Sequence, residues 1–245
     1  MAEFNATRGN HRQDQIPDWP ARFKQLASQA RDPRLQGFYQ AGTVDGDTPI
    51  SQVPLVSVDF ETTGLNSQTD GIVSIGLIPM SLQRIRCSQA QHWILKPREE
   101  LNSESIVIHG ITHSEVAEAP DILSILGELL EAIQGSILVV HHRGIERPFL
   151  NAALESRLGE GIEFPVIDTM DLEARVHRRN SRKFVDRLFK RRPVSIRLAD
   201  SRTRYNLPFY HPHHALSDAV ATAELLQAQI AHRYSPDTPV KALWR

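Results

Sequence analysis

The first half of the chain contains three apolar runs that predict β-strands. Val53–Phe60 is apolar and rich in β-branched residues. Ile72–Met80 is a second run of this kind, directly after the turn-forming pair Asp70-Gly71. Arg84–Leu95 follows closely enough to pair as a third strand. We therefore expect a sheet that begins with three consecutive strands.

Helices and strands alternate in the second half. Pro120 begins an apolar pattern with the 3.6-residue period of a helix. Ser136–His141 has the pattern of a strand, and the apolar positions that follow it predict another helix. A short strand, Phe164–Ile167, and a final helix, Ala215–Ile230, complete the series. Three strands followed by alternating helices and strands predict an α/β domain.

The N-terminal part of the chain lacks a sheet pattern. Residues 1–15 are polar without periodicity and are expected to be disordered. Asp18–Ala30 predicts a short helix capped by Asp18, and Gln36–Gln52 has the Gly, Asp and Pro content of a connector. The predicted organisation is an N-terminal extension (residues 1–50), one domain (residues 51–235) and a C-terminal tail (residues 236–245).

The formal charges nearly balance over the whole chain. Lys and Arg number 28 against 29 Asp and Glu in 245 residues, a net charge of −1, which excludes a uniformly basic, histone-like protein. Residues 171–205 nevertheless carry twelve basic and four acidic side chains, a local +8, which leaves −9 on the rest. Such a segment suits a polyanionic partner, although 23 Arg against 5 Lys also fits a bias of nucleotide composition.

Cysteine content and hydropathy narrow the class of protein. Cys87 is the only cysteine, so the sequence excludes a disulfide framework and a zinc cluster made of cysteines. No apolar run approaches the ~20 residues of a membrane span, and the first residues lack the basic-then-apolar order of a signal peptide. We therefore expect a soluble protein of the reducing cytoplasm with no membrane partner.

Two acidic residues end the first predicted strand. Side chains alternate along a strand, so Asp59 and Glu61 lie on the same face. Like charges on one face repel unless a cation lies between them, and hard divalent metals prefer carboxylate oxygens. Acid pairs of this spacing also occur on solvated surfaces, as Asp45 and Asp47 do in a predicted loop. A metal site is one of two interpretations of this pair.

Further acids follow in the second half. Glu146 begins the helix after the fourth strand, and Asp218 opens the final helix, with His213 five residues before it. Each acid alone also fits an ordinary first-turn position, where the helix dipole favours an anion. Asp59, Glu61 and Glu146, however, lie at the carboxyl ends of strands, where open α/β sheets bind ligands. Four carboxylates can hold two divalent cations ~3.5–4 Å apart, which suits phosphodiester hydrolysis, and His213 can act as a general base.

Three motifs occur in the order of a known enzyme family. They are Val-Asp59-Phe-Glu61-Thr-Thr-Gly-Leu65, Val-His141-His-Arg-Gly-Ile-Glu146-Arg-Pro-Phe-Leu150 and His213-His-Ala-Leu-Ser-Asp218-Ala. Supporting matches are Ile108-His109-Gly110-Ile111-Thr112 and Val166-Ile167-Asp168-Thr169. From about Pro54 to Ala231, the chain resembles the DEDDh branch of the 3′-to-5′ exonucleases (DnaQ-like), which includes the epsilon proofreading subunit of bacterial DNA polymerase III.

The resemblance implies a ribonuclease H-like fold, a mixed five-stranded sheet flanked by helices, here with an N-terminal extension. It also implies release of nucleoside 5′-monophosphates from the 3′ ends of nucleic acid, with single-stranded DNA as the expected substrate and two Mg²⁺ or Mn²⁺ ions per site. Asp59, Glu61, Glu146 and Asp218 would hold the metals, and His213 would be the base. The expected substrate-binding residues are Thr62, Thr63, Gly64, Leu65, His109 and Phe149.

The second motif departs from the family. Glu146 stands where the family has Asp, and His142 and Arg143 replace Asn and Ala, which would place a bulky cation near the site. One alternative is therefore a nucleic-acid-binding module with reduced or lost catalysis. A second is an RNA-directed exoribonuclease, because the motifs do not separate RNA from DNA. The N-terminal extension lies outside the resemblance, and its open roles are docking on the domain, dimer formation, and binding a DNA polymerase or another partner.

The basic segment contains two parts. A short helix is expected after Ser195, which would cap it, with Arg197, Arg202 and Arg204 near the site. The preceding stretch Arg175–Arg192 fits either a solvated helix face or an electrostatic track for the nucleic-acid backbone.

Overall fold

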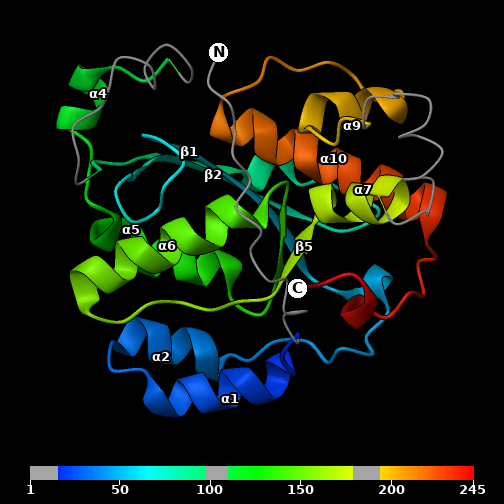
Figure 1. The fold of residues 1–245 in the computed structure, drawn as a ribbon. Helices are drawn as coiled ribbons and strands as arrows, with labels where there is room; N and C mark the ends of the chain where they lie inside the picture. Colours follow the sequence, from blue (N-terminus) through cyan, green and yellow to red (C-terminus); the bar gives the residue numbers. More distant parts are fainter. Residues whose placement is uncertain (1–15, 98–109, 179–193) are drawn as a thin grey trace.

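The computed structural model describes residues 16–97, 110–178 and 194–245, and within them five strands form one mixed sheet (Figure 1). The strand order is β3–β2–β1–β4–β5. β1 pairs antiparallel with β2 and parallel with β4, β2 pairs antiparallel with β3, and β4 pairs parallel with β5. This confirms the expected mixed five-stranded sheet. The strands are β1 (Leu55–Thr62), β2 (Ile72–Met80), β3 (Gln91–Ile94), β4 (Ile137–Val140) and β5 (Val166–Asp168).

The third strand is shorter than its sequence pattern predicts. The chain after Met80 turns back at once, and the backbone N–H of Ser81 donates to the carbonyl of Arg84 at 2.8 Å. A 3₁₀ helix, Cys87–Gln89, then precedes β3. This tight turn occupies the residues that were expected to extend the strand, so only Gln91–Ile94 pairs with β2.

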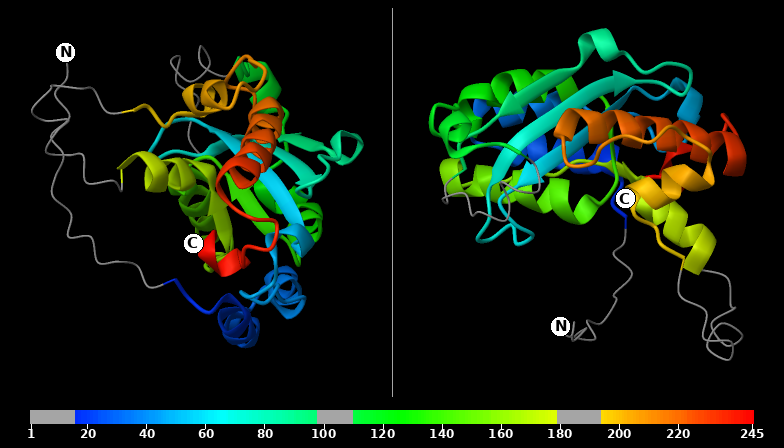
Figure 2. Two further views of the ribbon diagram at one scale, coloured as in Figure 1. Left: turned by 90° about the vertical axis from the view of Figure 1, so that its right-hand side faces the viewer. Right: turned by 90° about the horizontal axis from the view of Figure 1, so that it is seen from above.

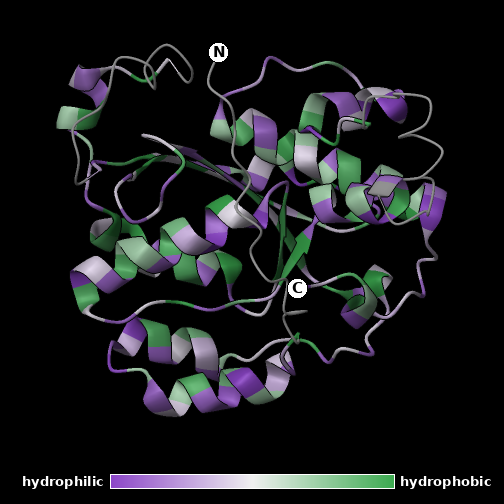
Figure 3. Ribbon diagram, viewed as in Figure 1, coloured by the Kyte–Doolittle hydropathy of each residue, from purple (hydrophilic) through white to green (hydrophobic). Residues whose placement is uncertain are grey.

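Helices cover both faces of the sheet (Figures 1 and 2). α5 (Ile122–Ile133) and α6 (Arg143–Leu158) lead into β4 and β5, and the right-handed crossovers of parallel strands place both on one face. α10 (Ala215–Arg233) packs against β1 and β2 on the other face. The strands are largely hydrophobic (Figure 3) because both faces are covered. Shorter helices are α4 (His113–Ala117), α7 (Thr169–Arg178) and α9 (Leu198–Arg204).

A glycine in β2 brings α10 unusually close to the sheet. A side chain at Gly76 would overlap the backbone of Ala215 and Leu216, the first residues of α10. Nearby, the Ser57 hydroxyl donates to the carbonyl of Ala219 at 2.7 Å. The small residues at the start of α10, Ala215 and Ala219, therefore lie directly against the sheet.

The N-terminal extension contains two helices. α1 (Trp19–Gln29) begins after Asp18, whose carboxylate accepts from the N–H of Ala21, as predicted. α2 (Pro33–Gln40) was not predicted, and it replaces the first part of the expected connector. The apolar side chains of both helices belong to the main core, and α2 packs on α5. Docking on the domain is therefore what this part of the extension does. The buried members are Trp19, Phe23, Leu35, Phe38 and Tyr39.

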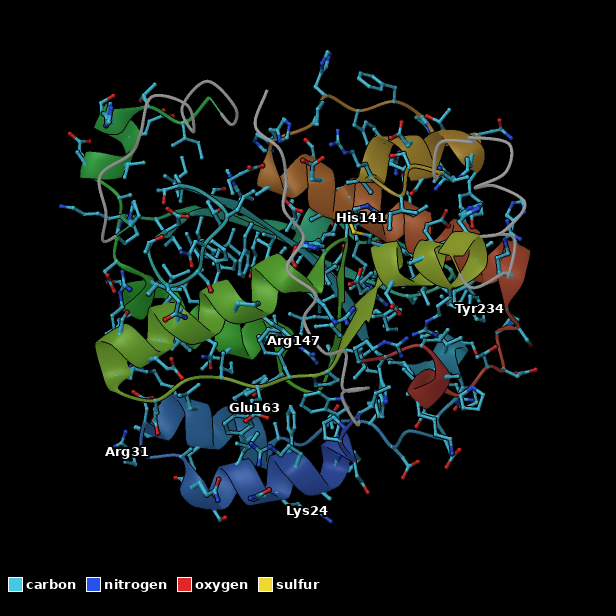
Figure 4. All side chains as sticks on the ribbon, in the orientation of Figure 1. Lys24, Arg31, His141, Arg147, Glu163 and Tyr234 are labelled. Carbon is cyan, nitrogen blue, oxygen red and sulfur yellow. The ribbon has the colours of Figure 1, made fainter. Side chains whose placement is uncertain are left out.

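One arginine joins the extension to the helix that carries Glu146. The guanidinium of Arg147, which Figure 4 labels, lies 5.1 Å from the centre of the Trp19 ring. It donates to main-chain oxygens of Phe164 and Arg245. Burial lowers the pKa of Arg147 to about 10. The predicted C-terminal tail is also packed, because Val240, Leu243 and Trp244 are buried. None of the described helices is long and apolar enough to cross a membrane.

Candidate active site

Three carboxylates from two elements meet beside the carboxyl end of β1. In the antiparallel register Asp59 lies opposite Gly76, and opposite residues share a face of the sheet. Because Gly76 is covered by the start of α10, the Asp59 and Glu61 side chains face the helix that carries Asp218. Asp59, Glu61 and Asp218 each have a carboxylate oxygen within 4.8 Å of the others. The strand alternation and the close approach at Gly76 together create this group.

Asp218 is oriented by the loop before α10. Its Oδ2 accepts a hydrogen bond of 2.7 Å from the backbone N–H of His213. His213 adopts a positive φ of 70°, a left-handed conformation that is uncommon for a residue with a side chain. His214, the next residue, is the N-cap of α10. The His213 imidazole is exposed on the wall of the cavity that contains the acids.

Glu146 lies beside this group without being part of it. It is 3% exposed, and its Oε2 has no hydrogen-bond partner. Its negative charge is one of the causes that raise the pKa of Asp59, so the two carboxylates interact. An unpartnered buried carboxylate oxygen is costly, and a cation would supply the missing partner.

The pKa values of the acids show the same need for positive charge. Burial, followed by the charges of Glu146, Asp218 and Glu61, raises the pKa of Asp59 well above its ordinary value. Burial and the charge of Asp218 raise the pKa of Glu61 to about 7. Among the described residues, no Lys or Arg forms an ion pair with these acids. Divalent cations fit this donor set, since hard metals bind carboxylate oxygens.

A cavity of about 510 Å³, which we name the acidic cavity, contains all four acids and His213. Ile145, residues of α9 and the loop after α9 also line this cavity. Sequence reasoning missed Ile145 and most of the loop. The adjacent aromatic residues Phe209 and Tyr210, just before the third motif, were the sequence signal that could have indicated this part of the cavity. The loop members are Leu207, Pro208, Phe209 and Tyr210.

Arg143 of the second motif pairs with acids other than Asp59, Glu61, Glu146 and Asp218. Arg143 was expected to place a positive charge near the site, but its guanidinium lies 3.3 Å from Asp168 and 3.9 Å from Asp171. His141 is buried at the end of β4 (Figure 4), with Nδ1 2.8 Å from the Thr169 hydroxyl. Burial lowers the pKa of His141 to about 4. His142 is exposed and lines the acidic cavity.

Two of the three arginines expected at the entrance are held by internal ion pairs. Arg202 lines the acidic cavity, but it is buried and pairs with Glu224 at 2.7 Å. Arg204 pairs with the buried carboxylate of Glu173 at 2.6 Å. Arg197 is exposed and lines the acidic cavity. It also occupies the N-cap position of α9, where Ser195 was expected; the Ser195 hydroxyl bonds the Asp200 carboxylate instead.

The substrate-binding residues predicted from the first motif lie at the end of β1, in the case of Thr62, and in the loop that follows. Thr62, Thr63, Gly64 and Leu65 follow Glu61 directly but do not line the acidic cavity. The loop is closed by the N–H of Gly71, which donates to the Thr63 hydroxyl at 3.0 Å. The Asp70 carboxylate occupies the space that a side chain at Gly64 would need, so a larger residue at this position would have to displace it.

The remaining predicted substrate-binding residues are Phe149 and His109. Phe149 is 2% exposed and lines a different cavity, of about 320 Å³, between α6 and the loop after β1. Phe149 lies one turn after Glu146 on α6 but does not line the acidic cavity. His109 lies outside the described residues, as do most of the segment Arg175–Arg192 and residues 1–15.

Comparison with known proteins gives one matching family. The sequence profile of the RNase_T family, described as an exonuclease, matches residues 56–226. The chain is 31% identical over 179 residues to the PolC-type DNA polymerase III of Thermotoga petrophila, which covers 73% of this chain and 12% of that protein. It is 30% identical over 179 residues to a DNA polymerase III subunit epsilon-like protein of Rhodobacter capsulatus, covering 73% of this chain and 24% of that protein. The chain thus spans a quarter or less of these relatives.

Solved structures share the fold. Exonuclease X, in complex with 5′ overhanging duplex DNA, superposes with a TM-score of 0.55 at 24% identity, covering 76% of this chain and 97% of that chain. The nuclease domain of 3′hExo, a DEDDh family member bound to rAMP, gives a TM-score of 0.59 at 15% identity, covering 76% and 94%. These similarities confirm the ribonuclease H-like sheet with flanking helices.

Proposed function

The chain belongs to the RNase_T exonuclease family, and from this premise we propose that it is a metal-dependent 3′-to-5′ exonuclease that removes nucleoside 5′-monophosphates from single-stranded DNA. The observation that carries the proposal is the group formed by Asp59, Glu61 and Asp218, within 4.8 Å of one another in an open cavity. Carboxylates gathered so closely with raised pKa values suit divalent cations and little else.

Each residue of the site has a role in this proposal. Asp59, Glu61 and Asp218 would hold one Mg²⁺ or Mn²⁺, and Asp59 and Glu146 would hold a second. When bound, such ions lower the pKa of water and stabilise the charge of a phosphodiester during its hydrolysis. His213 would accept the proton of the attacking water, because its exposed imidazole lies on the same cavity wall. The hydrogen bond from the backbone N–H of His213 to the Asp218 carboxylate holds the proposed base and the proposed metal ligand close together.

The substrate and the partners are proposed on narrower grounds. Exonuclease X is seen with DNA, whereas 3′hExo is seen with rAMP, so the related fold accepts both sugars. We favour DNA because both sequence relatives are DNA polymerase III proteins. The same relatives support association with a polymerase, for which residues 1–50 are the candidate segment. The single cysteine supports a cytoplasmic location.

The experiment that tests the activity uses matched DNA and RNA oligonucleotides labelled at either end, with Mg²⁺, Mn²⁺ or EDTA. Stepwise loss from the 3′ end that stops in EDTA is expected, with DNA as the better substrate. Asp59→Asn should abolish it, while Glu128→Gln, an exposed change on α5, should not. Digestion without metal, or full activity of Asp59→Asn, would overturn the proposal.

A second candidate is a nucleic-acid-binding module without catalysis. It is favoured by the position of Glu146, which lies outside the group of three carboxylates and replaces the family's Asp. A Glu146→Asp variant decides between the two. Activity that appears only in the variant would establish the binding module, whereas activity in the unaltered protein would establish the nuclease.

A further inference from the structure

Phe209 is an aromatic side chain that the fold leaves uncovered at the mouth of the acidic cavity. It is 73% exposed. Among the described residues, the other exposed large apolar side chains are Ile16, Leu65 and Val194, and Phe209 is the one of these four that lines the acidic cavity. An exposed ring beside a cavity, unlike a scattered surface residue, points to a ligand with an apolar face.

The loop that carries Phe209 is fixed by a buried arginine. Arg202 is 4% exposed. Its guanidinium donates to the carbonyl of Ala221 at 2.6 Å, to the carbonyl of Pro208 at 2.8 Å and to the carboxylate of Glu224 at 2.7 Å. Ala221 and Glu224 belong to α10, so Arg202 ties Pro208 to the helix that carries Asp218.

The residue on the other side of Phe209 is fixed to the same group. The Tyr210 hydroxyl donates to Glu224 at 2.9 Å, and the Arg202 guanidinium lies 4.6 Å from the centre of the Tyr210 ring. Pro208 and Tyr210 are therefore both anchored, and Phe209 between them is held outward. We name Arg202, Tyr210 and Glu224 the loop clamp.

Two neighbours complete the surroundings of the ring. The His211 ring meets Phe209 nearly edge-on, with centroids 5.5 Å apart and planes at 78°. The exposed guanidinium of Arg197 lines the same cavity. An aromatic face and an exposed cation that line one cavity match a nucleotide, whose base stacks and whose phosphate is negative.

We propose that Phe209 is a stacking platform for a nucleobase of the single-stranded substrate, presented by the loop clamp. This inference rests on the proposed exonuclease function and adds the residue that would select unpaired ends. A base inside a duplex has both faces covered and can stack on an aromatic ring only after it has left its own stack, so such a platform favours a single strand. Because the clamp holds the ring in place before binding, little ordering of the loop is needed when the base arrives.

The test compares Phe209→Ala and Phe209→Trp with the unaltered protein. Binding of a single-stranded DNA oligonucleotide is measured by fluorescence anisotropy with Ca²⁺ in place of Mg²⁺, and cleavage is measured separately with Mg²⁺. A set of oligonucleotides carries one abasic nucleotide at successive positions from the 3′ end. Thermal unfolding checks that both variants fold, and Ile16→Ala serves as a matched change of an exposed apolar residue far from the cavity.

Phe209→Ala is expected to weaken binding of the intact strand about tenfold, with kcat nearly unchanged, while Phe209→Trp retains the affinity. One abasic position should weaken binding to the unaltered protein by a similar factor and should have no further effect in Phe209→Ala. Equal affinity of Phe209→Ala and the unaltered protein would overturn the proposal, as would losses that simply add at every abasic position.

The two proposals fail in different ways. If the protein binds the strand with the Phe209 dependence but cleaves nothing with Mg²⁺ or Mn²⁺, the exonuclease function is wrong and the stacking platform stands. If cleavage proceeds from the 3′ end and neither affinity nor KM depends on Phe209, the stacking platform alone is wrong. An absence of any binding would refute the platform.

Discussion

Replacing Glu61 with Gln is expected to stabilise the metal-free protein while removing its activity. Burial and the charge of Asp218 raise the pKa of Glu61 from 4.5 to about 7. One pKa unit corresponds to about 1.4 kcal/mol, so ionised Glu61 costs the folded state roughly 3 kcal/mol. The carboxylate is 8% exposed, and water therefore screens little of this cost.

The pH dependence follows from the direction of the shift. As the pH rises from 4.5 to 7, unfolded Glu61 loses its proton while folded Glu61 keeps it. The folded state then binds more protons, so the free energy of unfolding falls over this window and levels off above it. Glu61→Gln removes the contribution of Glu61 to this decrease in the free energy of unfolding. Its advantage over the unaltered protein should be small near pH 4.5 and approach roughly 3 kcal/mol at pH 8.

The assay is urea unfolding at several pH values in EDTA and again with Mg²⁺ or Mn²⁺. Metal should stabilise the unaltered protein and should stabilise Glu61→Gln much less, because one ligand is missing. Glu128→Gln, which removes an exposed carboxylate of α5, should change neither the pH dependence nor the response to metal. Equal stability of Glu61→Gln and the unaltered protein at pH 8 without metal would refute the reasoning.

Three further predictions concern buried residues that support the fold around the acidic cavity. Gly76→Ala should destabilise the fold by about 2 kcal/mol or more in urea unfolding and reduce activity, because the new methyl group overlaps the start of α10. As a control, Gly127→Ala meets no atom within 4 Å and should stabilise the fold by up to about 1 kcal/mol. Trp19→Ala should cost about 3–5 kcal/mol in thermal or urea unfolding, since Trp19 belongs to the main core; a loss below 1 kcal/mol would show that the extension is dispensable. Burial lowers the pKa of His141 from 6.5 to about 4, so protonation of the unfolded state should remove about 2 kcal/mol of stability between pH 7 and pH 5. His141→Gln should lack this part of the acid sensitivity, and identical pH slopes would contradict the argument.

Local patterns in the sequence were enough to predict most elements of the sheet and its principal helices. β2 and the helix from Ala215 begin at the predicted residues, because apolar alternation and the 3.6-residue period are properties of a few neighbouring positions. The same alternation placed Asp59 and Glu61 on one face. The unpredicted α2 has few apolar residues of its own, and its burial against α5 supports it.

Local sequence patterns did not predict the partners of the charged side chains. Arg143, Arg202 and Arg204 had the same expected location near the site, yet each is paired with an acid from a distant part of the chain. An arginine bonds whichever carboxylate or carbonyl the fold brings within reach, and its own sequence position does not reveal that partner. The exposure of Phe209 has the same origin, since it depends on contacts of Pro208 and Tyr210 with α10.

The sequence by itself therefore determined the order of the elements, the four acids with His213, and the family that these residues resemble. The tertiary structure alone decided which of them meet. It joined Asp59, Glu61 and Asp218 through the close approach at Gly76, left Glu146 beside them, and paired Arg143 with Asp168. Periodicity acts over a few residues, whereas distance, burial and pairing arise from contacts between segments far apart in the chain.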